Sequence, residues 1–166
     1  MEASQAQTVL SEHTRHEIDE WVLKYPPEGK RSAVAAALRA VQHQNEGYLT
    51  TELMDAVADY LDLPKIHVYE AASFYSMFET EEVGRHSVSV CTNISCMLRG
   101  GEELLEHIEA KLGIKVGEST SDKRIFLKRE EECLAACCGA PMMMIDHVYH
   151  EHLTPERVDD ILDSLE

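Results

Sequence analysis

The sequence lacks any apolar run long enough to cross a membrane, although 44% of its 166 residues are hydrophobic. It is also poor in positive charge, with 15 Lys and Arg against 31 Asp and Glu and a formal net charge of −16. Nucleic acids and anionic lipids are bound by basic patches, so neither is an expected partner. An acidic chain of this kind complements a basic docking face on another protein, and we expect no direct insertion into a membrane.

Motifs for nucleotide binding and dithiol chemistry are absent as well. Gly100 and Gly101 open a predicted helix, but neither a GxGxxG turn nor a Walker sequence surrounds them. The C-x-x-C pair typical of thioredoxin redox chemistry does not occur. No acid–base or nucleophilic constellation is recognisable either. We therefore expect no catalytic residues, and no substrate chemistry by the chain alone.

Five cysteines are present, and all of them lie in two short stretches. Cys91 and Cys96 are separated by four residues. Cys133 and Cys137 are separated by three, and Cys138 is an additional thiol. Two close pairs can supply four thiolates to one centre only if the fold brings their loops together. The odd number of cysteines and the absence of an export signal weigh against a disulfide framework and favour a reducing, cytoplasmic compartment.

Four thiolates could bind a zinc ion or an iron–sulfur cluster, or could form two disulfides. Structural zinc sites typically have two residues between paired cysteines. A gap of four residues is instead similar to the first cysteine pair of plant-type 2Fe–2S ferredoxins. A two-iron core is longer than a single ion, so two opposed pairs can each hold one iron. The spacing favours a cluster and leaves zinc, disulfides and simple burial as alternatives.

A resemblance to a known family is carried by two segments, VGRHSVSVCTNISCMLRGGEELL and EEECLAACCGAPMMMI. They resemble the E subunits of NADH–quinone oxidoreductase, the thioredoxin-like 2Fe–2S ferredoxins of respiratory complex I. The family pattern combines C-x-x-x-x-C with C-L-G-x-C-x-x-A-P, and this chain departs from it at Ala135, where glycine is usual. Glycine at that position permits a positive φ, so the substitution concerns the local backbone. The likeness extends upstream to residues 72–78 and covers about residues 10–165.

The resemblance implies that Cys91, Cys96, Cys133 and Cys137 bind one 2Fe–2S cluster. It implies an electron-transfer subunit in the NADH-oxidising peripheral arm of NADH–quinone oxidoreductase, on the cytoplasmic side of the bacterial inner membrane. The implied partners are a flavoprotein that binds FMN and NADH, with which electrons are exchanged, and the large iron–sulfur subunit. Cys138 falls at a variable position of the family, so we expect it to be a small filler and not a ligand.

Two alternatives to this function are kept open. One is the homologous diaphorase subunit of a soluble NAD-linked hydrogenase or formate dehydrogenase. The other, of a different class, is a zinc-stabilised assembly module without a redox role.

The hydrophobic period predicts an α+β chain in two parts. Within the first part, residues 1–80, the period is helical from Ser11 onward. Predicted helices begin at Ser11 and near Ser32, and two more are predicted over residues 51–61 and 67–78. Four short amphipathic helices predict an N-terminal four-helix bundle. Residues 81–166 are predicted to form a thioredoxin-like domain with the order β-α-β-β-β-α. Its expected strands and helices are a strand leading into the first cysteine, a helix after the glycine pair, strands at 125–128, 142–145 and 148–149, and a last helix from Pro155.

Two further features bear on partners and on charge. Phe74, Tyr75 and Phe78 lie at helical spacing and are expected in the core of the bundle. Partner docking is the alternative for them, because aromatic residues are enriched in interface cores. The acidic residues 130–132, next to Cys133, would disfavour the extra negative charge that a cluster gains on reduction.

Overall fold

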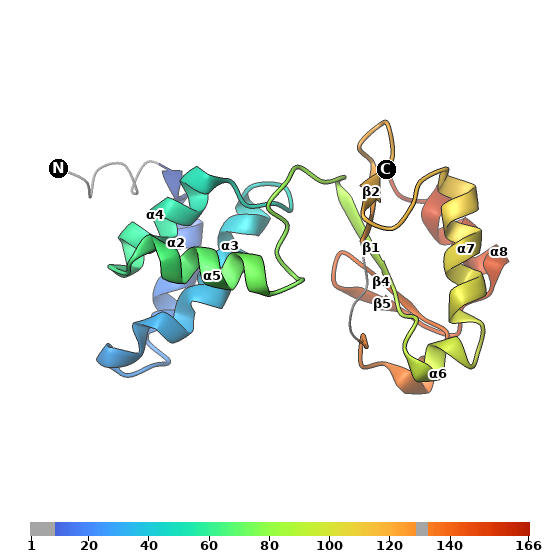
Figure 1. The fold of residues 1–166 in the computed structure, drawn as a ribbon, viewed down its shortest axis with the longest axis horizontal. Coiled ribbons are helices and arrows are strands. Elements are labelled where there is room, and N and C mark those ends of the chain that lie inside the picture. Colours follow the sequence, from blue (N-terminus) through green and yellow to red (C-terminus); the bar gives the residue numbers. More distant parts are fainter. Residues whose placement is uncertain (1–8, 129–132) are drawn as a thin grey trace. The chain divides into compact units, whose positions relative to one another are not determined.

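A computed structural model describes residues 9–128 and 133–166 of the chain (Figure 1). Contacts between Cα atoms divide the chain into two compact units, residues 1–82 and 83–166. Each unit has a hydrophobic core made of its own residues. Within the described ranges, every helix is too short or too polar to span a lipid bilayer.

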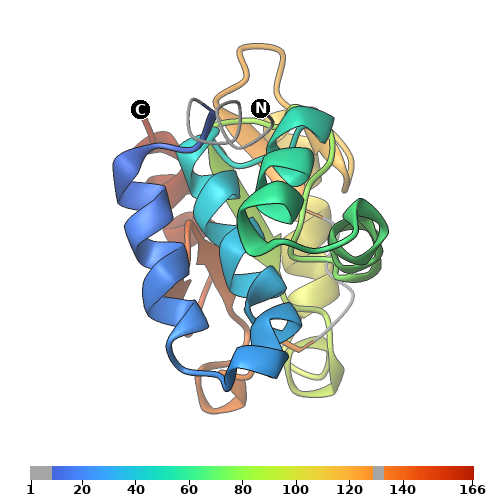
Figure 2. The ribbon, with the colours of Figure 1, turned by 90° about the vertical axis from the view of Figure 1, so that its left-hand side faces the viewer.

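The described part of the first unit is helical. Its elements are α2 (Glu12–Val22), the 3-10 helix η1 (Pro27–Ala33), α3 (Val34–Gln44), α4 (Thr51–Leu61) and α5 (Lys65–Phe74). Two of these helices begin at a capping hydroxyl, because the side chains of Ser11 and Thr50 accept hydrogen bonds from backbone N–H groups of the following turn. Ser32, predicted as a cap, lies inside η1 instead, and α3 begins two residues later. Figure 2 shows α2 and α3 side by side, and all four α-helices contribute buried residues to one core.

The end of α5 differs from the prediction. The helix ends at Phe74 and not at Phe78, because Tyr75 adopts an extended conformation with φ −90° and ψ 124°. The segment that follows is held by the side chain of Gln42, which accepts a hydrogen bond from the backbone N–H of Glu79 at 2.9 Å. Phe78 is buried, whereas Phe74 is 80% and Tyr75 46% exposed. The prediction of core packing is therefore wrong for Phe74 and Tyr75.

The second unit is built on a five-stranded mixed sheet with the strand order β2-β3-β1-β4-β5. Its strands are β1 (His86–Val90), β2 (Glu118–Ser119), β3 (Ile125–Lys128), β4 (Met143–Ile145) and β5 (Val148–His150). The central strand β1 is parallel to β3 and antiparallel to β4, so that Val88 pairs with Leu127 on one side and with Ile145 on the other. The prediction missed β2, because a two-residue strand shows no measurable alternation.

Among the described residues, three α-helices accompany this sheet. They are the short α6 (Ile94–Met97), α7 (Gly101–Leu112) and α8 (Pro155–Asp163). Figure 1 shows α7 and α8 next to each other, and Lys111 of α7 joins them through an ion pair of 2.8 Å to Asp163. Their buried residues share one core with β1, β3 and β4. The predicted start of α8 is confirmed, with the Thr154 side chain as the cap and Pro155 in the first turn. The short α6 was not predicted.

We predict that residues 1–80 and 81–166 are independently folding domains, a division that lies two residues before the boundary between the two observed units. A fragment of residues 79–166 is expected to unfold cooperatively on heating, because all core residues of the second unit lie within it. Circular dichroism at two wavelengths would measure this, with the full chain as the control. A gradual loss of the circular dichroism signal of the fragment on heating, without a folded baseline, would contradict the prediction. The second unit would then need the N-terminal helices in order to fold.

Candidate metal centre

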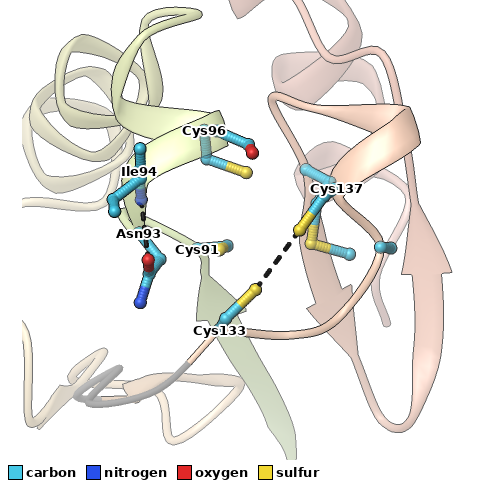
Figure 3. A pocket seen from close by; sticks show the side chains of 9 residues that line it. Cys91, Asn93, Ile94, Cys96, Cys133 and Cys137 are labelled. Carbon is cyan, nitrogen blue, oxygen red and sulfur yellow. Dashed lines mark hydrogen bonds between the residues drawn. The ribbon is translucent and has the colours of Figure 1, made fainter.

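Four of the five cysteines line one pocket at an edge of the sheet (Figure 3). Cys91 directly follows β1, and Cys96 lies in α6. Cys133 and Cys137 belong to the connection between β3 and β4, with Cys137 at the start of the 3-10 helix η2 (Cys137–Gly139). Because β1 pairs with both β3 and β4, the end of β1, the end of β3 and the start of β4 meet at the same edge. The sheet thus brings together two loops that are far apart in the sequence.

The four thiols are arranged as two pairs. The sulfur atoms of Cys133 and Cys137 are 3.6 Å apart. Thiolate–metal bonds of about 2.3 Å at a tetrahedral angle place two sulfurs roughly 3.8 Å apart, so this pair is spaced as for one metal ion. Cys91 and Cys96 form a second pair, and the Cys91 thiol lies near enough to Cys96 to affect its pKa. Across residues 9–128 and 133–166, no three His, Cys, Asp or Glu side chains gather around a single metal position.

The two pairs differ in their environment. Cys91 and Cys96 are buried, with 2% of each residue exposed, whereas Cys133 and Cys137 are exposed. Burial raises the pKa of Cys96 to about 11, and the hydrogen bond with Cys91 adds to the effect. The hydrogen bond with Cys133 raises the pKa of Cys137, and one from the Ser95 hydroxyl opposes this rise. Both thiols are therefore protonated near neutral pH without a metal, and binding iron would release these protons.

Hydrogen-bond donors reach the sulfurs of the exposed pair. The backbone N–H of Ala135 donates to the Cys133 sulfur at 3.3 Å. Ser95, on the loop that carries the buried pair, also lines the pocket, and its hydroxyl lowers the pKa of Cys137. Donors of this kind favour a negatively charged sulfur. The sequence did not single out Ser95, because which sulfur its hydroxyl faces depends on how the two loops meet.

Ala135 has a left-handed backbone conformation, with φ at 63°. This region is sterically unfavourable for residues other than glycine. Alanine thus replaces the usual glycine here, but the backbone keeps the left-handed conformation that glycine adopts easily. The backbone at Ala135 is therefore strained. The turn aims the Ala135 N–H at the Cys133 sulfur, so the strained residue helps to hold a pocket-lining cysteine.

A close approach between α7 and the first cysteine loop requires glycine at position 101. A Cβ atom on Gly101 would lie 2.9 Å from the backbone oxygens of both Cys91 and Cys96. Both contacts are with backbone, which cannot move aside as a flexible side chain can. The start of α7 is thus packed directly against the loop that holds the buried cysteine pair.

Cys138 has a different position from the other four cysteines. Nine of the described residues line the pocket, and Cys138 is not among them. Cys138 is exposed, so it does not fill space in the interior as expected. The acidic residues 130–132, which are expected to oppose reduction of a cluster, lie outside the described residues.

Comparison with known proteins identifies relatives along most of the chain. The sequence profile of a family described as thioredoxin-like 2Fe–2S ferredoxin matches residues 18–166. The E subunit of NADH-quinone oxidoreductase from Rickettsia bellii is 44% identical over 144 residues, which are 87% of this chain and 86% of that protein. An E subunit of NADH-quinone oxidoreductase from Rhizobium meliloti, numbered 2, is 41% identical over 150 residues, 90% of this chain and 87% of that protein.

The fold is also similar to a solved structure. A chain in the crystal structure of an NAD+-reducing NiFe hydrogenase in the air-oxidised state matches with a TM-score of 0.66. The match covers 82% of this chain and 22% of that chain, at 23% sequence identity. At that level of identity the similarity concerns the fold alone.

We predict that Cys138→Ser keeps the spectrum of a bound 2Fe–2S cluster, whereas Cys137→Ser loses or strongly alters it. Cys137 lies within 3.6 Å of Cys133, and its neighbour is outside the pocket lining. Electron paramagnetic resonance of the dithionite-reduced proteins would measure the difference. Loss of the signal in folded Cys138→Ser protein would overturn the assignment, and a Cys137→Ser/Cys138→Ser double variant tests whether Cys138 can replace Cys137.

Replacing Ala135 by glycine should stabilise the protein. The left-handed conformation destabilises the folded state by about 1–2 kcal/mol when the residue is alanine. Glycine removes this strain but loses more backbone entropy on folding, which offsets roughly 0.5–1 kcal/mol of the gain. We expect the free energy of unfolding of Ala135→Gly to rise by about 0.5–1 kcal/mol in urea denaturation. Ala136→Gly is the matched control, because Ala136 has a negative φ of −108° and should lose stability on the same change. Equal losses in both variants would contradict the argument.

Proposed function

The chain belongs to the thioredoxin-like 2Fe–2S ferredoxin family, and on this premise we propose that it is the electron-transfer subunit of the NADH-oxidising module of an NADH–quinone oxidoreductase. The 44% identity to an E subunit of that complex, over 87% of the chain, is the observation that carries this proposal. The chain is then one part of an oxidoreductase complex. Its cofactor is a 2Fe–2S cluster, while FMN and NADH belong to a partner subunit.

We assign the buried pair, Cys91 and Cys96, to one iron and the exposed pair, Cys133 and Cys137, to the other. The two-pair arrangement and the sulfur separation of 3.6 Å in the exposed pair support this assignment. A 2Fe–2S cluster bound there would accept and return one electron. The zinc alternative is less well supported, because a single ion requires four ligands around one point.

Residues around the pocket would affect how well a bound cluster tolerates additional negative charge. A cluster with four thiolates carries a net charge of about −2, and reduction adds one more negative charge. The hydrogen bond from the Ala135 N–H to the Cys133 sulfur, and the Ser95 hydroxyl that lowers the pKa of Cys137, would stabilise that added charge. Met142 lines the pocket and is 1% exposed, so it shields the inner side from water.

The proposal includes specific partners and a location. The expected partners are the flavoprotein that binds FMN and NADH and the large iron–sulfur subunit, on the cytoplasmic side of the bacterial inner membrane. The net charge of −16 supports docking on a basic protein surface. We also propose that α2 to α5 form a four-helix bundle, which is supported by the core that they share.

A second candidate is the diaphorase subunit of a soluble NAD-linked hydrogenase or formate dehydrogenase. The fold similarity to a chain of an NAD+-reducing NiFe hydrogenase is the observation that supports this second candidate. Both candidates assign the same electron transfer to this chain and differ in the complex that it joins. Identification of the proteins that co-purify with the chain from its native cells would distinguish them.

We predict that NADH reduces the protein only when the FMN-containing subunit is present. The reason is that this chain has a thiol site but no nucleotide-binding motif. Anaerobically purified protein should show visible absorption that dithionite bleaches, and NADH should bleach it only after the flavoprotein is added. A colourless protein with stoichiometric zinc, or reduction by NADH alone at enzymatic rates, would overturn the proposal.

A further inference from the structure

Apolar side chains are concentrated on the outside of α6. Ile94 is 66% exposed, Met97 43% and Leu98 76%, and together these three residues are called the α6 surface. Isolated exposed apolar residues are common on proteins, but three within five residues form a patch typical of an interaction site. The patch lies on the same short segment as Cys96, and Ile94 also lines the cysteine pocket (Figure 3).

We propose that the α6 surface is the docking site for the flavin-bearing partner subunit. This inference rests on the proposed function and adds to it the side chains that bind the partner. Electron transfer slows steeply with distance, so a redox partner has to approach the open side of the cluster site. That side carries the exposed Cys133 and Cys137, whereas Cys91 and Cys96 are buried beneath it. A protein that covers the exposed sulfurs would also cover Ile94, which lines the same pocket.

The charge of this segment supports an apolar contact. The chain has 31 acidic residues among 166, yet residues 83–101 contain neither Asp nor Glu. Interface cores are depleted in charged residues, and an acidic residue beside the site would also oppose reduction of the cluster. The partner surface that fits here is therefore apolar at its centre, and basic partner residues would meet other, acidic parts of this chain.

The α6 surface is held in a defined conformation before any partner binds. The Asn93 side chain accepts a hydrogen bond from the Ile94 backbone N–H at 2.8 Å. The backbone N–H of Leu98 donates to the Ile94 oxygen at 3.0 Å, and Gly101 packs against the backbone of Cys96. A surface that is already ordered loses little conformational entropy on binding, which favours affinity.

The test compares Leu98→Gln with Leu23→Gln in the full-length, cluster-loaded chain. Both leucines are highly exposed, at 76% and 84%, and Leu23 lies in the other unit at the end of α2. We expect Leu98→Gln to weaken binding to the purified FMN-containing flavoprotein subunit about tenfold or more, as for a central apolar contact. Leu23→Gln should bind as the unchanged protein does, and the conservative Leu98→Met should retain most of the affinity.

The readouts separate this inference from the proposed function. Dithionite should still produce the cluster signal in Leu98→Gln, while the rate of NADH reduction at limiting flavoprotein should fall in proportion to binding. Met97→Gln, at a second position of the α6 surface, is measured if Leu98→Gln loses the cluster. If the unchanged chain is not reduced by NADH and flavoprotein, the proposed function fails.

Two results would overturn the inference while leaving the proposed function in place. One is equal affinity of the flavoprotein for the unchanged chain and for a cluster-bearing α6 variant. The other is a change in the oligomeric state of the isolated chain caused by Leu98→Gln, measured by sedimentation. That second result would assign the α6 surface to self-association.

Discussion

The pairing of β1 with both β3 and β4 is the constraint on which the cysteine site depends. Cys91 leaves the end of β1, and the strands on either side are joined by the connection that carries Cys133 and Cys137. Besides these strand pairings, one described backbone hydrogen bond joins the two cysteine loops, from the Cys91 N–H to the Met142 oxygen. Loss of either strand pairing would therefore separate the two thiol pairs. The glycine at the start of α7 then fixes the first loop against the helix that covers the sheet.

Burial divides the site into an inner and an outer half with different physical properties. The inner half, Cys91 and Cys96, lies in an apolar environment that disfavours charge, as the raised pKa of Cys96 indicates. The outer half, Cys133 and Cys137, is exposed. The Ala135 N–H donates a hydrogen bond to the Cys133 sulfur, and Ser95 lowers the pKa of Cys137. Charge added at such a site is better stabilised on the outer side, which is also the side that the proposed partner would approach.

Several apolar residues of this chain lie outside its hydrophobic cores. Phe74 and Tyr75 fit the inner face of a longer helix in the sequence, but the helix ends before that pattern can place them inside. Ile94 and Leu98 are also apolar and exposed, at 66% and 76%, and Ile94 lines the thiol pocket. An apolar residue in the sequence can therefore belong to the core or to an interface, and the local pattern does not distinguish the two.

Features that depend on neighbouring residues could be predicted from the sequence. The spacing of the cysteines defined two pairs, the bounds of α4 agree with the prediction, and Thr154 with Pro155 marked the start of α8. Capping, prolines and hydrophobic period act within a few residues, so they can be recognised locally. The strand order, the short β2, the position of Ser95 near Cys137 and the burial of particular thiols became known only from the three-dimensional structure. These features depend on the register between segments far apart in the chain, which no local pattern encodes.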